Sequence, residues 1–152
     1  MPDWWLNQSH GDVAANDSFP AVTLDCHKPT PIYRFKIPER GLVLWPGKLY
    51  LGATVERTAS DTLVPLFDGR SSLARLGLSV HQTGGFGDLG FSGTWTVELS
   101  CVEPVRIYAG IEIGQLVVCT CKGDVDLLYS QKSTSKYNNQ QAPTPSKIYQ
   151  EQ

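Results

Sequence analysis

The chain has 152 residues, of which 41% are hydrophobic and 18% are charged, and its 13 Lys and Arg against 15 Asp and Glu give a net charge of -2. This length predicts one domain that can bury roughly 70% of its unfolded surface, enough for a core without metals or disulfides. The missing basic excess argues against a general nucleic-acid binder, and no apolar run approaches the roughly 20 residues of a membrane helix. Fourteen Gly and ten Pro favour short strands and tight turns over a helical bundle.

Residues 1–20 are polar and irregular, apart from the cluster Trp4-Trp5-Leu6, which could begin a short helix or anchor the terminus. They lack the basic region and apolar stretch of a secretion signal, so we expect a cytoplasmic protein. The cysteines are too few and too unevenly spaced for a disulfide framework, and we expect structural thiols at Cys26, Cys101, Cys119 and Cys121. The last two alternate within an apolar run, which predicts that both point to one face of a strand as buried or half-buried groups.

Strand signals follow in series through the middle of the chain. Short β-favouring segments, separated by turns rich in Gly or Pro, cover residues 21–24, 32–37, 42–45, 49–55, 62–67, 78–82, 94–99, 105–108 and 115–121. Helical character is confined to residues 72–76, where Gly77 is well placed to end a single turn. The pattern therefore predicts an all-β barrel or sandwich with one short helix.

Residues 130–152, here called the tail, differ abruptly in composition from the body. They are rich in Ser, Gln, Asn, Thr, Pro and Lys and contain almost no aliphatic side chains. Such a segment cannot pack a core, so it is either disordered or becomes ordered on a ligand. Tyr129, Lys136 and Gln140 recur there at intervals of seven and four residues, a pattern that a simple linker explains equally well when taken alone. We expect residues 1–152 to form one domain with a variable N-terminus (1–20) and this tail.

The segment Asp68-Gly-Arg-Ser-Ser-Leu-Ala-Arg75 combines two arginines, two hydroxyls and a helical turn. Guanidinium groups and free N–H groups at the start of a helical turn suit an anion. The alternative is a capped turn with two solvated arginines.

Glu98 is expected on a strand face that it shares with Thr94 and Thr96. A carboxylate held among neutral polar groups can act as a general acid and base, whereas most strand glutamates are simply exposed.

Zinc nucleobase deaminases need His-x-Glu and Pro-Cys-x-x-Cys motifs, and neither occurs in this chain. We therefore expect no zinc, and we interpret His81 as a packing or hydrogen-bonding residue.

Several motifs occur in a fixed order along the chain: Gly69-Arg-Ser-Ser-Leu-Ala-Arg75, Gly77-Leu78, Thr83, Asp88-x-Gly-Phe-x-Gly93 and Glu98-Leu99, with Pro46–Glu56 upstream and Ile113-Gly-Gln-Leu116, Lys136–Gln141 and Pro143–Ser146 downstream. Together they resemble the dCTP deaminase branch of the dUTPase-like superfamily. The resemblance covers roughly residues 37–150. It implies a homotrimer of a mainly β, distorted jelly-roll-like fold with a flexible C-terminal lid and active sites between subunits. It also implies hydrolysis of the 4-amino group of dCTP to give dUTP and ammonia without zinc.

The resemblance also assigns roles to individual residues. Glu98 becomes the proton shuttle, while Ser71 and Arg75 position the water and the base and stabilise charge at C4. The implied substrate-binding residues include Arg70 and Ser72 at the phosphates, with Leu73 and Ala74 in the same turn. Asp88 is implied at the deoxyribose, and the backbone at Thr96 and Val97 at the cytosine edge. Tyr129, Lys136 and Gln140 are implied to form a lid over the triphosphate. Mg²⁺ is expected on the nucleotide phosphates, with no protein ligand.

Gly85-Phe86 looks like the Gly-Phe or Gly-Trp pair of bifunctional members, which convert dCTP to dUMP and diphosphate. In those enzymes Asp88 would also help to activate water at phosphate, and Gln115 resembles the phosphate-side Gln of dUTPases. A monofunctional deaminase, a bifunctional deaminase, a plain dUTPase and a catalytically silent nucleotide sensor all stay open at this point. Glu98 and Arg75 argue against the plain dUTPase, and the intact set of expected active-site residues argues against the sensor.

Overall fold

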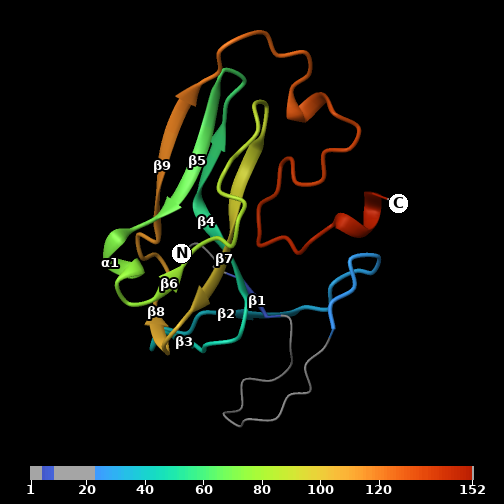
Figure 1. Ribbon diagram of the computed structural model, residues 1–152. Coiled ribbons are helices and arrows are strands. Elements are labelled where there is room, and N and C mark those ends of the chain that lie inside the picture. Colours follow the sequence, from blue (N-terminus) through green and yellow to red (C-terminus); the bar gives the residue numbers. More distant parts are fainter. Residues whose placement is uncertain (1–4, 9–22, 152) are drawn as a thin grey trace.

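The computed structural model describes residues 5–8 and 23–151 (Figure 1). Its strands are β1 (Trp5–Gln8), β2 (Tyr33–Lys36), β3 (Leu42–Leu44), β4 (Tyr50–Ala59), β5 (Leu63–Gly69), β6 (Leu78–Ser79), β7 (Ser92–Cys101), β8 (Val105–Ile107) and β9 (Gly114–Thr120). Its helical segments are α1 (Ser71–Ala74) and the 3-10 turns η1 (Tyr129–Gln131) and η2 (Ile148–Glu151). The described part of the chain is mainly β with one short α-helix, as predicted, and contains no helix long and apolar enough to cross a membrane.

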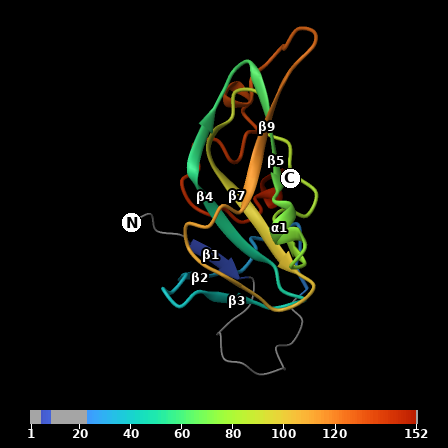
Figure 2. The ribbon, with the colours of Figure 1, turned by 90° about the vertical axis from the view of Figure 1, so that its left-hand side faces the viewer.

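Three antiparallel sheets make up the body of the molecule as described. The largest has the strand order β2-β1-β4-β7-β6, while β3 pairs with β8 and β5 pairs with β9. Within the large sheet, Tyr50 of β4 lies opposite Leu99 of β7, and the register shifts between Ala53 and Arg57. The β5–β9 pair lies beside β4 and β7 in both views (Figures 1 and 2). The three sheets do not close on one another, so the predicted β architecture is present in an open form.

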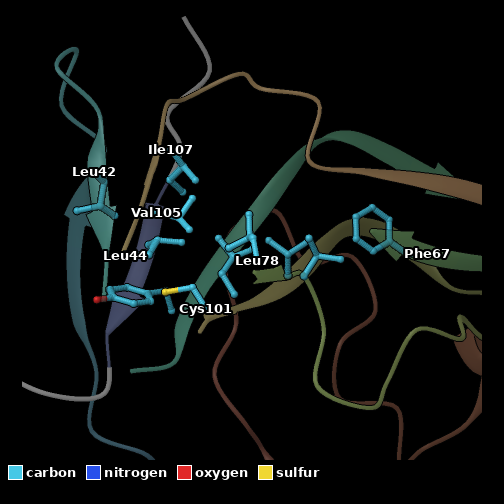
Figure 3. Close-up of a cluster of buried hydrophobic side chains, with 11 residues drawn as sticks. Leu42, Leu44, Phe67, Leu78, Cys101, Val105 and Ile107 are labelled. Atoms are coloured by element: carbon cyan, nitrogen blue, oxygen red, sulfur yellow. The ribbon is translucent and has the colours of Figure 1, made fainter. Parts of the chain in front are cut away.

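The hydrophobic core is assembled from alternating positions of several strands (Figure 3). On β7, Val97, Leu99 and Cys101 are all buried, and Leu99 is only 2% exposed. Since neighbouring strand residues point to opposite faces, this leaves Thr96 and Glu98 on the other face of β7, as predicted. The remaining core members come from β3, β4, β5, β6, β8 and the residue after β6, namely Leu42, Leu44, Tyr50, Phe67, Leu78, Val80, Val105 and Ile107.

The predicted helical turn is present but shorter than the expected residues 72–76. It begins at Ser71 and ends at Ala74, and Gly77 follows it with a φ of +80°. A Cβ atom at Gly77 would lie 2.3 Å from Cγ2 of Val102, so glycine is required both by the backbone and by the neighbouring side chain. The prediction that Gly77 terminates this turn is confirmed.

Two local predictions need correction, and one open question has an answer. The N-terminal cluster, which the sequence left undecided, contributes Trp5 and Leu6 to a strand, β1, which pairs with β2 and β4, while Trp4 lies outside the described residues. Of the predicted strand 21–24, residues 23 and 24 are not in a strand, and residues 21 and 22 lie outside the described residues. Cys119 and Cys121 are exposed rather than buried, because among the described strands β9 pairs only with β5, and its residues 115–120 are all exposed in the single chain. Cys101 is buried, whereas Cys26 is exposed.

Candidate active site

A pocket of about 420 Å³ lies between β7, the glycine-rich loop that precedes it (residues 84–90), and the tail. This volume falls within the roughly 300–1,000 Å³ of typical small-molecule sites. The pocket is lined by six of the residues that the sequence singled out: Phe86, Asp88, Thr96, Glu98, Tyr129 and Gln140. Apolar side chains from elsewhere complete its walls, including Leu24, Ile32, Leu49, Leu51, Phe91 and Trp95.

Glu98 is held on the pocket face of β7 by the segment that follows β6. The backbone N–H of Gln82 donates to Oε2 of Glu98 at 3.0 Å. The side chain of Gln82 reaches the same strand, where its Nε2 donates to Oγ of Ser100 at 2.9 Å and to the carbonyl of Glu98 at 3.4 Å. Glu98 is half-buried, so its carboxylate is oriented by the protein and still reachable from the pocket. This arrangement suits a group that exchanges protons with a bound molecule.

The glycine-rich loop places Phe86 and Asp88 in the pocket by running against β5. The carbonyl of Gly85 accepts a hydrogen bond from the backbone N–H of Phe67, and the N–H of Gly87 donates to the carbonyl of Pro65. A Cβ at Gly85 would lie 2.8 Å from the Phe67 carbonyl oxygen, so only a glycine permits this approach. Gly85 is itself buried and does not line the pocket, whereas Phe86 is 76% exposed at its rim.

The tail forms one wall of the pocket by lying along the edge of β7. Nε2 of Gln140 donates to the Thr94 carbonyl at 2.7 Å, and the Thr94 N–H donates to the Gln140 carbonyl at 3.0 Å. Further along, Oγ1 of Thr96 accepts a hydrogen bond from the backbone N–H of Thr144 at 3.1 Å. The polar tail is therefore bound to the body through specific hydrogen bonds, which fits its composition.

Tyr129 organises the beginning of the tail. Its hydroxyl oxygen accepts hydrogen bonds from the backbone N–H groups of Lys136 and Tyr137, at 3.1 and 3.0 Å. Its ring lies 6.1 Å from that of Phe91, which in turn lies 5.8 Å from Trp95. The row of aromatic rings fixes where the tail starts relative to β7. Tyr137 and Thr144 also line the pocket. Both lie within motifs that carry the family resemblance, but neither was predicted as a site residue, because the resemblance assigns roles to Lys136 and Gln140 instead.

The other predicted residues lie away from this pocket in the single chain. Ser71, Ser72, Leu73, Ala74 and Arg75 belong to α1 or its end, and Figure 1 shows α1 and the tail on opposite sides of the sheets. None of them lines the pocket, nor do Arg70, Val97, Lys136 and Gln115. Val97 has its side chain in the core, and Gln115 on β9 lies opposite Asp68 and lines a separate cavity.

Two predicted phosphate-binding cations are paired with carboxylates. Arg70 forms an ion pair with Glu112, and Lys136 forms one with Glu151 in η2. The hydrogen bond to Glu151 raises the pKa of Lys136 above its ordinary value. Any anion that used these cations would compete with the two glutamates.

His81 and Asp68 form a second polar group near α1. Nε2 of His81 lies 3.4 Å from Oδ1 of Asp68, which also accepts a hydrogen bond from the Gly69 N–H at 2.7 Å. The Gly69 N–H, followed by the contact with His81, lowers the pKa of Asp68. The interpretation of His81 as a hydrogen-bonding residue is thus confirmed.

Comparisons with known proteins show which family this chain resembles. A family described as dCTP deaminase-like matches residues 12–121. A protein from Leptospira biflexa serovar Patoc named dCTP deaminase, dUMP-forming, is 44% identical over 150 residues, which cover 99% of this chain and 82% of that protein. A protein of the same name from Clostridium acetobutylicum is 48% identical over 150 residues, which cover 99% of this chain and 83% of that protein. Another of the same name, from Cytophaga hutchinsonii, is 47% identical over 128 residues, which cover 84% of this chain and 72% of that protein. The chain therefore belongs to the dCTP deaminase-like family.

Proposed function

We propose that this protein is a dCTP deaminase of the dUMP-forming type, which converts dCTP and water to dUMP, ammonia and diphosphate. The observation that carries the proposal is a single pocket lined by two carboxylates, Glu98 and Asp88, in a chain whose relatives bear that name. The names of these relatives favour dUMP over the dUTP product that the sequence alone put first.

The first step is hydrolysis at C4 of the cytosine ring. Glu98 takes a proton from a water molecule while the water oxygen forms a bond to C4. The proton then passes to the 4-amino nitrogen, the C4–N bond breaks and ammonia leaves. The proton left on the oxygen at C4 moves to N3, which gives uracil. The Gln82 N–H, 3.0 Å from Oε2, keeps the carboxylate oriented while it gains and loses that proton.

The second step is hydrolysis at the α-phosphorus. Asp88 takes a proton from a second water molecule, whose oxygen forms a bond to phosphorus as the bridging bond to the β-phosphate breaks. The products of this step are dUMP and diphosphate. We expect Mg²⁺ to be bound by the phosphates of the substrate, where it would neutralise charge on the leaving diphosphate.

The substrate-binding roles follow the same assignment. Thr96 and the backbone beside it face the base, and Gln140 and Tyr129 close over the phosphates together with Lys136. The ion pair of Lys136 with Glu151 opens as the triphosphate takes the place of the carboxylate. We place the enzyme in the cytoplasm, where free deoxynucleotides occur.

The same proposal makes the enzyme a homotrimer with shared active sites. Ser71 and Arg75 are needed at C4, yet α1 lies away from the pocket of its own chain. Strand β9 exposes Leu116, Val117 and Val118 at 41, 48 and 54%, an apolar surface of the kind that subunits bury. A neighbouring subunit that covered β9 with its own pocket side would meet α1 of this chain (Figure 1), so that each site would be completed by the α1 of another subunit.

The test is product analysis after incubation with dCTP and Mg²⁺. Ammonia, dUMP and diphosphate are expected. Ammonia with dUTP as the final product would indicate a monofunctional deaminase, and cleavage of dUTP without any action on dCTP would indicate a plain dUTPase. Binding of dCTP without turnover would indicate a nucleotide sensor and contradict the proposal.

A further inference from the structure

Arg57 joins the tail to the body of the protein at a point outside the pocket. It lies on β4, and its Nη2 donates to Oγ of Ser92 on β7 at 2.6 Å and to Oδ1 of Asn139 in the tail at 2.9 Å. Asn139 follows Arg57 by 82 positions in the sequence, so this one nitrogen connects two strands to the far end of the chain. Arg57 does not line the pocket, and the activity proposed above gives it no role.

Asn139 has an unusual backbone at this contact. Its φ is 60°, and it is the only residue other than glycine with a positive φ in the described part of the chain. Asparagine tolerates this left-handed conformation better than most residues do. The N–H of Asn139 donates to the Ser92 carbonyl, and Oδ1 of the preceding Asn138 accepts from the Ser92 N–H. Both backbone groups of Ser92 and its hydroxyl therefore take part in holding the tail.

The sharp turn at Asn139 decides where the next residue lies. Gln140 is bonded through its backbone carbonyl and its Nε2 to Thr94, and its Oε1 lies 3.5 Å from Oγ1 of Thr96 on the pocket face of β7. A shift of the tail by one residue would break this set of contacts and present a different side chain to the pocket. The position of Gln140 in the pocket wall thus depends on how the tail is anchored one residue earlier.

We propose that Arg57 is a positioning residue: together with Asn139 and Ser92 it forms a latch that sets the register of the tail and so places Gln140 in the pocket. The inference rests on the proposed function for its effect on substrate, since the latch itself touches no substrate. Because the tail covers the bound nucleotide and does not touch the reacting carbon, loss of the latch should weaken binding more than chemistry.

Four variants separate the latch from nonspecific effects. Arg57→Met removes the donor, and Asn139→Gly removes the acceptor while permitting the positive φ. Asn139→Asp keeps an acceptor oxygen and the same backbone preference, so it should retain the latch. Arg106→Met is the matched control, because Arg106 is an exposed strand arginine on β8 whose Nη1 bonds to the Arg40 carbonyl.

Hydrogen exchange of the substrate-free protein tests the latch directly. The amides of Asn139 and Thr144 donate to Ser92 and Thr96 across the tail–β7 contact. Their exchange should speed up by about tenfold in Arg57→Met and Asn139→Gly, the effect of losing one charge-assisted hydrogen bond. The Arg57→Met/Asn139→Gly double variant should be no worse than Arg57→Met, because that variant already removes the contact with Asn139. Asn139→Asp and Arg106→Met should match the unaltered protein.

Steady-state kinetics test the consequence. KM for dCTP should rise about five- to tenfold in Arg57→Met and Asn139→Gly, with kcat within about twofold of the unaltered enzyme. Unchanged exchange at Asn139 and Thr144 in both variants would overturn the latch, as would equal effects in Arg106→Met. If Arg57→Met does not fold, the comparison of Asn139→Gly with Asn139→Asp decides the question. Absence of dCTP turnover in the unaltered protein would contradict the proposed function, while the exchange measurement would still decide the latch.

Discussion

Replacing Glu98 by glutamine should abolish deamination and leave the protein folded. The substitution keeps the size of the side chain and keeps an oxygen that can accept the Gln82 N–H, which now lies 3.0 Å from Oε2. The side chain of Gln82 would still bond to Ser100, so the local structure should persist. An amide, however, cannot take a proton from water and deliver it to a leaving amine.

The expected loss follows from that missing proton transfer. A positioned general acid and base contributes about 10²- to 10⁴-fold to a rate, which corresponds to about 2.7–5.4 kcal/mol of activation free energy at about 1.36 kcal/mol per factor of ten. We therefore expect kcat for ammonia release to fall by at least about a hundredfold, with affinity for dCTP within about tenfold of the unaltered enzyme.

The assay is ammonia release from dCTP with Mg²⁺, accompanied by a direct binding measurement. Glu103→Gln is the matched control, because Glu103 is an exposed glutamate in the turn between β7 and β8 and lies outside the pocket. Normal turnover by Glu98→Gln would remove Glu98 from its assigned role. A fall in turnover matched by Glu103→Gln would show that the loss comes from a changed charge and not from proton transfer.

Three further predictions concern the tail, a turn and a buried phenol. Removing residues 130–152 deletes the hydrogen bonds from the tail to Thr94 and Thr96. Because each hydrogen bond contributes about 0.5–1.5 kcal/mol, KM for dCTP should rise about ten- to hundredfold. Unchanged kinetics would refute a role for the tail. Gly77→Ala should lower the free energy of unfolding by about 2–4 kcal/mol, since it adds backbone strain to a clash with Val102. Gly47 also has a positive φ but has open space around it, so Gly47→Ala should lower the free energy of unfolding only by the backbone strain. Equal losses of unfolding free energy for the two variants in urea denaturation would show that the clash with Val102 contributes nothing. Burial raises the pKa of the Tyr50 hydroxyl above its ordinary 10.0, so the neutral phenol stabilises the fold below pH 10.0 and this stabilisation is lost as the pH rises further. Tyr50→Phe should therefore reduce the fall in melting temperature at alkaline pH. An unchanged pH dependence of the melting temperature would contradict this role of Tyr50.

The parts of the fold that the sequence predicted well depend on local periodicity. The period of two along β7 separates Val97 and Leu99 in the core from Glu98 on the pocket face, and no distant information is needed to see it. Gly77 is likewise a local signal, because a left-handed residue ends a helical turn. Strand β1 was not predicted, because its four residues, Trp5–Gln8, are too few to show the alternation of apolar and polar side chains that indicates a strand.

The errors concern properties that depend on what packs against an element. The apolar strand around Cys119 predicts burial, yet burial requires a second layer, and none of the described residues forms one over β9 in the single chain. The same limit applies to the site. Local motifs identified Glu98 and Gln140, which the fold brings into one pocket, but no local pattern could show that Arg75 lies elsewhere in the same chain. Nor could it reveal Arg57, whose partner is 82 residues away.

The most direct test of the account is a time course of dCTP hydrolysis in the presence of Mg²⁺ that follows ammonia and diphosphate in the same sample. If one pocket performs both steps through Glu98 and Asp88, one ammonia and one diphosphate should appear for each dUMP formed. Glu98→Gln should stop the ammonia, and Asp88→Asn should stop the diphosphate. Ammonia release that leaves dUTP as the only nucleotide product in the unaltered enzyme would contradict the dUMP-forming assignment, and no ammonia at all would contradict the deaminase.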